Sequence, residues 1–188
     1  ETCGGRRETA DALAAHRAGR ARVTEVRASD YVGPDLGETS HLGDRFVPAI
    51  LAGKTARGFG AVDVPHSWSY MGDVCRTMVT VGLDERADGR AGHAPTLAPK
   101  TITEMADAFA DAAGVERVRV ARLPRVALRL VGVVVPMFRA LLTMAYQFDE
   151  PFEIDATDTI ATFGLEPTPF DQQVAETLAS YGVEVVSA

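Results

Sequence analysis

Hydrophobic residues recur every three or four positions in four stretches of the chain, the spacing of an amphipathic helix. One stretch, residues 41–52, is followed by Gly53, a good stop signal for a helix. Another starts with Thr101 and Glu104, which form the S/T-x-x-E pattern of a capping box. The apolar positions of the four predicted helices are Phe46, Val47, Ile50 and Leu51; Val74, Met78 and Val81; Met105, Ala106, Phe109 and Ala113; and Phe170, Val174, Leu178 and Tyr181.

Polar residues mark the ends of several of these helices. Asp73 stands where the N-cap of the helix containing Val74 is expected. Thr168 is followed by a proline and then by an acidic residue in the first turn, which is typical of a helix start. Residues 8–18 are rich in strong helix formers and stop at Gly19, so they predict the tail of a further helix.

Strand-like stretches alternate with these helices. We expect strands near residues 21–29, 57–60, 68–70, 90–95 and 118–120. This mixed α/β alternation predicts an α/β fold class. We find no internal repeat, no low-complexity tract and no linker long enough to divide the chain into two independent domains.

The most apolar region runs from Leu123 to Phe148. It is interrupted by Arg125, Arg129, Pro136 and Arg139. The uncharged runs between these residues are too short for a membrane-spanning helix, which needs about 20 apolar residues. The preferred interpretation is a pair of buried or dimer-facing helices split at the proline. A membrane-surface or substrate-entry segment is the alternative.

Composition and charge narrow the class of protein. The chain has 188 residues, 46% of them hydrophobic and 24% charged, as in an ordinary globular protein that can bury a sizeable core. Its formal net charge of -7 disfavours a nucleic-acid partner, and no basic patch with interleaved aromatics is evident.

Cysteine and histidine spacing argues against metal sites. Cys3 and Cys75 lie far apart without a C-x-x-C pattern, which argues against a zinc site and against a disulfide framework, and favours a reducing cytoplasm. The four histidines are too widely spaced for a helical metal pair. The first residue is Glu1 and not Met, so we interpret the N-terminus as artificial, with no signal peptide.

Four motifs occur in a recognisable order. They are R-x-S-D-Y-x-G-P at residues 27–34, a helix with Phe46 and Pro48, H-S-W-S-Y-M-G-D-V at residues 66–74, and G-R-A-G-H-A-P-T at residues 89–96. In this order and spacing, the chain resembles the C-terminal part of the extended short-chain dehydrogenase/reductase family, the NAD-dependent epimerase/dehydratase group. The resemblance covers nearly the whole chain.

The resemblance implies an architecture. It implies the C-terminal portion of a Rossmann-type, doubly wound parallel sheet with a small mixed α/β substrate-binding subdomain. Residues 1–40 and parts of 55–100 would be the remnant of the Rossmann sheet, and residues 41–54 and 96–188 the substrate-binding subdomain. The resemblance also implies a homodimer, paired through a helix of which residues 8–16 are the remnant.

The resemblance further implies where ligands bind. Gly33 and Pro34 would line the nicotinamide of NAD or NADP, since glycine allows a close backbone approach and proline fixes the corner; an ordinary turn is the alternative. Asp30 would accept a hydrogen bond from a substrate hydroxyl, or else cap a local turn. Tyr31 would stack on a ligand, or else pack with its hydroxyl at the surface.

His66 departs from the family pattern. Related sugar-nucleotide epimerases commonly carry an arginine there, whose forked side chain clamps a diphosphate. A histidine cannot form that fork, so we expect a smaller carbonyl or hydroxyl substrate, with His66 in the substrate site. A surface histidine near a strand start, with no ligand role, is the alternative. His93 we interpret as a packing residue with a satisfied ring nitrogen.

The residues that perform hydride transfer in the family are not in this sequence. There is no Gly-rich G-x-G-x-x-G loop after a strand. None of Tyr31, Tyr70, Tyr146 and Tyr181 has a lysine four positions later. We therefore expect no catalytic residue in residues 1–188. A G-x-S-x-G elbow and an H-E-x-x-H motif are also lacking, which argues against serine-hydrolase and zinc-protease chemistry.

The leading hypothesis is therefore the substrate-binding C-terminal portion of an NAD(P)-dependent oxidoreductase or epimerase. The catalytic tyrosine, lysine and Gly-rich loop would lie upstream of Glu1. The alternative is a non-catalytic binding or regulatory protein that kept the scaffold. A lipid or membrane-surface binder that uses the segment 123–148 is a third, weaker idea.

Overall fold

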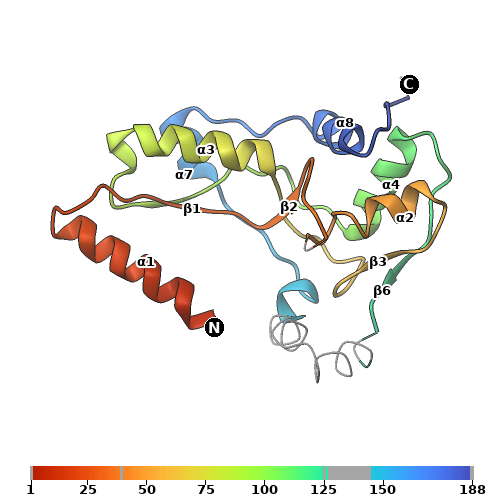
Figure 1. Ribbon diagram of the computed structural model, residues 1–188, viewed down its shortest axis with the longest axis horizontal. Coiled ribbons are helices and arrows are strands. Elements are labelled where there is room, and N and C mark those ends of the chain that lie inside the picture. Colours follow the sequence, from red (N-terminus) through yellow and green to blue (C-terminus); the bar gives the residue numbers. More distant parts are fainter. Residues whose placement is uncertain (1, 39, 125, 127–144, 187–188) are drawn as a thin grey trace.

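The computed structural model describes residues 2–38, 40–124, 126 and 145–186 (Figure 1). Its helices are α1 (Thr2–Arg17), α2 (Val47–Leu51), α3 (Met71–Leu83), α4 (Ile102–Ala112), α7 (Thr157–Phe163) and α8 (Phe170–Ser180), with short 3-10 helices η1 (Glu85–Ala87) and η2 (Ala145–Phe148). Its strands are β1 (Glu25–Arg27), β2 (Asp30–Val32), β3 (Ala56–Gly58), β4 (Trp68–Tyr70), β5 (Ala91–His93) and β6 (Val120–Arg122).

The strand pairs in the described part of the chain are parallel. β1 pairs with β5, β2 with β4, and β3 with β6, each over three residues. Parallel pairing between strands separated by helices is the signature of α/β architecture, so the predicted fold class is confirmed. The predicted strand at 21–29 is shorter, because only residues 25–27 find a partner strand.

The main core lies where α2, α4 and α8 pack beside β2 and β4 (Figure 1). Its fully buried members include Phe46, Ile50, Met105, Phe109 and Leu178, all taken from the predicted apolar helix faces. The capping box at the start of α4 is confirmed, since Thr101 Oγ1 accepts from the Glu104 N–H at 3.0 Å and Glu104 Oε2 accepts from the Thr101 N–H at 2.7 Å. α1 extends away from the other elements (Figure 1).

Two predicted helix caps are wrong. α3 begins at Met71, so Asp73 lies inside its first turn and not at the N-cap. Its buried carboxylate instead accepts hydrogen bonds from the Thr168 N–H at 2.8 Å and the Thr168 hydroxyl at 2.6 Å, and pairs with Arg76. Thr168 therefore does not cap α8, whose N-cap is Pro169. Together these contacts tie α3 to the loop before α8.

The prediction for the apolar segment 123–148 lies mostly outside the described residues. None of the helices in the described part of the chain is long and apolar enough to cross a membrane. His93 has the satisfied ring nitrogen that was predicted, because its Nδ1 lies 2.9 Å from the Asp155 carbonyl oxygen.

Candidate functional site

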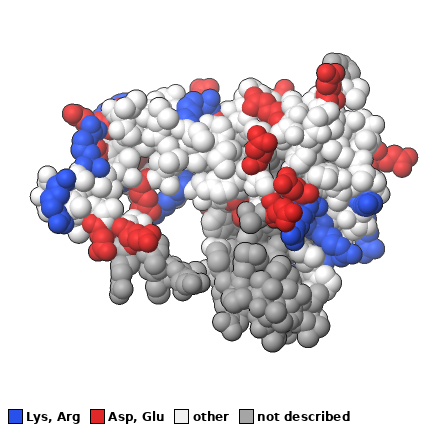
Figure 2. Space-filling view, in the orientation of Figure 1, with Lys and Arg blue, Asp and Glu red and all other residues white. Residues whose placement is uncertain are grey.

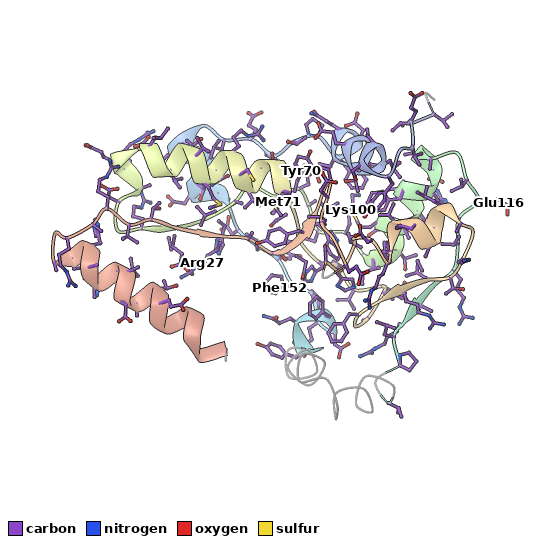
Figure 3. The ribbon with its side chains drawn as sticks, viewed as in Figure 1. Arg27, Tyr70, Met71, Lys100, Glu116 and Phe152 are labelled. Atoms are coloured by element: carbon purple, nitrogen blue, oxygen red, sulfur yellow. The ribbon has the colours of Figure 1, made fainter. Side chains whose placement is uncertain are left out.

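The R-x-S-D-Y-x-G-P stretch forms β2 and the corner that follows it. β2 lies against β4 in the register Asp30 to Trp68 and Val32 to Tyr70. Gly33 then turns with a φ of 143°, a conformation that side-chain-bearing residues rarely adopt. A Cβ atom at Gly33 would lie 3.3 Å from the Met71 Cβ atom, where β4 runs into α3 (Figure 3). The glycine is thus required by local geometry, whether or not a ligand lies beside it.

Asp30 and His66, both predicted from the sequence to bind substrate, lie in direct contact. The His66 Nε2 atom is 2.7 Å from Asp30 Oδ2 and 3.2 Å from the Ser29 hydroxyl oxygen. The side chain of His66 is 7% exposed, whereas that of Asp30 is 33% exposed. A ligand in this region would therefore meet Asp30 first, with His66 behind it.

Backbone pairing holds His66 firmly in place. His66 exchanges two backbone hydrogen bonds with Lys100, at 3.1 and 3.0 Å. The adjacent Ser67 N–H donates to the Phe152 carbonyl at 2.8 Å, and the Phe152 N–H donates to the Pro65 carbonyl at 3.1 Å. Lys100 and Phe152 both lie near the middle of the molecule (Figure 3). Residue 66 is therefore fixed from two sides.

Aromatic rings hold the imidazole itself. The rings of Phe148 and Phe152 stack on it, with centroid separations of 5.6 and 5.1 Å, and Trp68 lies at 5.0 Å. The alternative of a ligand-free surface histidine fails in one respect, because this side chain is buried. A small pocket beside it is lined by Ala61, Val64, His66, Trp68, Ile102, Phe148 and Glu150.

The hydrogen-bond chemistry of the pair follows from its geometry. A carboxylate oxygen accepts hydrogen bonds, so the His66 tautomer that carries its proton on Nε2 donates that N–H to Asp30 Oδ2. The Ser29 hydroxyl oxygen can share that N–H. In addition, the Ser29 backbone N–H donates to the Ser69 hydroxyl at 2.9 Å, which fixes the chain just before β2. The cluster thus presents Asp30 as a rigid acceptor for a hydroxyl or N–H group.

His41 is a neighbour of this cluster that the sequence reasoning did not single out. Its Nε2 atom accepts a hydrogen bond from the Phe59 backbone N–H at 2.9 Å, and its ring contacts Trp68 and Phe148. Burial lowers the pKa of His41 from 6.5 to about 4, which outweighs the opposing effect of the Asp30 charge. His41 is therefore a neutral acceptor at neutral pH. The residues next to His41 in the sequence gave no indication that it would contact Phe59.

The remaining predicted site residues do not enter the cluster. Tyr31 is on β2 but is 40% exposed. Pro34 is half-buried at the corner after Gly33. Ligand contacts of Gly33, Pro34 and Tyr31 stay predictions. Within the residues that the structure describes, no group of three or more His, Cys, Asp or Glu side chains is placed to hold a metal ion.

Comparison with known proteins gives matches in structure alone. No protein-family model matches the chain, and no curated protein matches its sequence. Among solved structures, UDP-glucuronic acid 4-epimerase from Bacillus cereus in complex with NAD aligns with 89% of this chain and 47% of its own, at a TM-score of 0.65 and 12% identity. dTDP-glucose 4,6-dehydratase from Streptomyces venezuelae, with NAD bound, aligns with 91% of this chain and 47% of its own, at a TM-score of 0.63 and 21% identity.

A third match extends the range of cofactors. RMD from Pseudomonas aeruginosa, complexed with NADPH, aligns with 92% of this chain and 52% of its own, at a TM-score of 0.66 and 14% identity. The chain thus spans about half the length of the solved structures that it matches.

These matches define the class of fold. The chain has the Rossmann-type α/β fold found in the C-terminal part of NAD-dependent epimerases and dehydratases. The resemblance stated from the four sequence motifs is therefore confirmed as a likeness of fold. At such low sequence identities, the similarity shows a shared fold and does not show a shared reaction.

Proposed function

We propose that this chain is the substrate-binding C-terminal portion of an NAD(P)-dependent oxidoreductase or epimerase that acts on a small carbonyl or hydroxyl compound. The observation that carries the proposal is the contact between Asp30 and His66 at the start of β2, the short strand that leads into the Gly33 corner. The matched structures of the same fold were solved with NAD or NADPH, which supports a nicotinamide cofactor.

The roles divide between the chain and the region upstream of it. In the proposal, Gly33 and Pro34 line the cofactor, and Asp30 accepts a hydrogen bond from the substrate. His66 holds the Asp30 carboxylate, and Tyr31 closes the substrate side of the corner. The tyrosine and lysine that transfer the proton, and the Gly-rich loop that binds the pyrophosphate, would be supplied upstream of Glu1.

The charge of Asp30 supports a small, uncharged substrate. A carboxylate at this point repels a diphosphate, whereas the arginine expected at position 66 in sugar-nucleotide enzymes would attract one. His66 is also unable to reach out to a phosphate, because it is 7% exposed and its Nε2 already contacts Asp30. The proposal includes a cytoplasmic location, which suits the free, exposed thiol of Cys75.

A substrate screen tests this proposal. Protein that extends upstream of Glu1 would be assayed for oxidation or reduction of the nicotinamide against small carbonyl and hydroxyl compounds and, in parallel, nucleotide sugars. For a compound that reacts, Asp30→Asn should raise KM about tenfold or more, because it removes a charged acceptor. Asp171→Asn, an exposed residue of α8, is the matched control. Turnover of nucleotide sugars alone would contradict the substrate class.

The second candidate is a non-catalytic binding or regulatory protein. The lack of a Tyr-x-x-x-Lys pair in residues 1–188 favours it. The upstream sequence separates the two: an in-frame Gly-rich loop followed by that pair supports the enzyme. Cofactor binding without turnover of any compound, in a protein that lacks the pair throughout, would support the binding protein.

A further inference from the structure

His66 has a second ring nitrogen, Nδ1, that its contact with Asp30 leaves unused. The contacts with Asp30 and with the Ser29 hydroxyl are both made at Nε2. In the tautomer that donates from Nε2, Nδ1 carries a lone pair and no proton, so it is a hydrogen-bond acceptor. None of the residues that the structure describes forms a hydrogen bond to Nδ1. The side chain that carries this free acceptor is only 7% exposed.

Nδ1 is in contact with open space and not sealed inside packed protein. Within the described part of the chain, no side-chain nitrogen or oxygen is both fully buried and without a hydrogen-bond partner. Because Nδ1 has no such partner, it must border a space that a water molecule can enter. His66 lines such a space, the pocket that it shares with Trp68, Phe148 and Glu150. This pocket has room for a water-sized group.

The side chains around this pocket offer hydrogen-bond acceptors and aromatic surface. Among its described lining residues, Trp68 already donates its Nε1 proton to the Lys100 carbonyl at 2.9 Å, so that donor is used. Glu150 is exposed and has no ion-pair partner in the part of the chain that the structure describes. The rings of Trp68 and Phe148 add aromatic surface, and the rest of the lining is aliphatic. Such a lining suits a group that donates hydrogen bonds and carries a positive charge.

We propose that this pocket is a binding site for the ammonium group of a small primary amine. An ammonium group is about the size of a water molecule and has three donors and no acceptor. One N–H donates to His66 Nδ1, and another is directed to the Glu150 carboxylate. The positive charge lies beside the rings of Trp68 and Phe148. The two nitrogens of an imidazole point in divergent directions, so the site is on the side of His66 away from Asp30. The inference therefore does not rest on the proposed function, which places its substrate at Asp30.

Basic side chains of the neighbouring segments are engaged elsewhere. Arg122 pairs with Asp149 at 2.6 Å, and the Lys100 ammonium lies 4.6 Å from the centroid of the Phe170 ring. The charge of Glu150 is therefore left for a ligand. The formal net charge of -7 adds a long-range attraction for cations, and Figure 2 shows acidic side chains spread across the visible face of the molecule.

Amine binding and the Asp30 contact support each other. A donor at Nδ1 requires the His66 tautomer that carries its proton on Nε2. The same tautomer donates to Asp30 Oδ2. An ammonium group in the pocket therefore holds the imidazole in the form that fixes the Asp30 carboxylate.

Ligand-observed NMR with the full-length protein at neutral pH tests the site, with methylammonium as the probe and methanol as its uncharged match. Methylammonium should bind saturably, with a Kd of about 10 mM because the ligand is so small, and methanol should not. Glu150→Gln should weaken binding about fivefold by removing the charge. Glu153→Gln, an exposed residue of the same segment outside the pocket lining, is the matched control and should bind normally. Equal binding of the two probes, or equal affinities of the two variants, would overturn the proposal.

Nitrogen NMR of protein labelled with 15N-histidine tests the geometry without a mutation. Methylammonium should shift the Nδ1 resonance of His66 more than the ring resonances of His93, whose Nδ1 already lies 2.9 Å from the Asp155 carbonyl oxygen. Binding that leaves the His66 Nδ1 resonance unchanged would show that the amine lies elsewhere. If another part of a longer chain fills the pocket, methylammonium will neither bind nor shift this resonance, which would also overturn the proposal.

Discussion

Acidification should destabilise the protein through His41. Burial lowers the pKa of this imidazole to about 4 in the folded state, against 6.5 in the unfolded chain. Between these two values the unfolded chain binds a proton that the folded protein does not. The contribution of His41 to the free energy of unfolding is therefore fully present above its pKa in the unfolded chain. It falls as the pH drops below that value, until the pKa of the folded protein is reached.

The magnitude follows from the two pKa values. Linkage gives a loss of about 2 kcal/mol in the free energy of unfolding between about pH 7 and about pH 5. That loss is about a 30-fold change in the ratio of folded to unfolded protein. The hydrogen bond from the Phe59 N–H to His41 Nε2 is also lost at low pH, because a protonated imidazole ring cannot accept it.

Urea unfolding at a series of pH values measures this effect. Trp68 is the single tryptophan, is 6% exposed and contacts the His41 ring, so its fluorescence reports on the same region; circular dichroism checks that the transition is two-state. His41→Gln keeps an acceptor and does not titrate, so it should remove about 2 kcal/mol of the acid-induced loss. His93→Gln controls for removing an imidazole elsewhere. An unchanged pH dependence in His41→Gln would show that His41 does not cause the acid-induced loss of stability.

Two further predictions concern stability at neutral pH, and urea unfolding checks both. Asp73→Ala should cost about 3 kcal/mol, because it removes the buried acceptor that ties α3 to Thr168, and Asp73→Asn should cost less. Equal losses for the two variants would contradict this role. Thr101→Ala should cost about 1 kcal/mol through loss of the capping box, so an unchanged midpoint would count against it.

The features that the sequence predicted well depend on neighbours along the chain. The capping box at Thr101 is a contact between residues three positions apart, and the inward faces of α4 and α8 follow from helical spacing. The turn at Gly33 is likewise a local property of the backbone. Asp30 and His66 were each singled out, although nothing in the sequence indicated that they would touch.

The features that the sequence did not predict depend on residues far apart along the chain. Asp73 looks like an N-cap locally, but its partner Thr168 lies 95 positions away. His41 gained its role from the Phe59 N–H, and His66 was buried by rings of the distant segment near Phe152. Helical spacing alone also could not show which side of α3 faces the core, because both sides are apolar; Met78, which the spacing placed with the buried residues, is 57% exposed.

A fluorescence titration of NADH and NADPH into protein that extends upstream of Glu1 tests the proposed cofactor site. We expect saturable binding that Gly33→Leu weakens by at least about tenfold, because a side chain at Gly33 would press on the Met71 Cβ atom and shift the corner that is proposed to line the nicotinamide. Gly164→Leu, at a positive-φ glycine where a Cβ would meet open space, is the matched control and should bind normally. A folded protein that binds neither cofactor would rule out the proposed cofactor site.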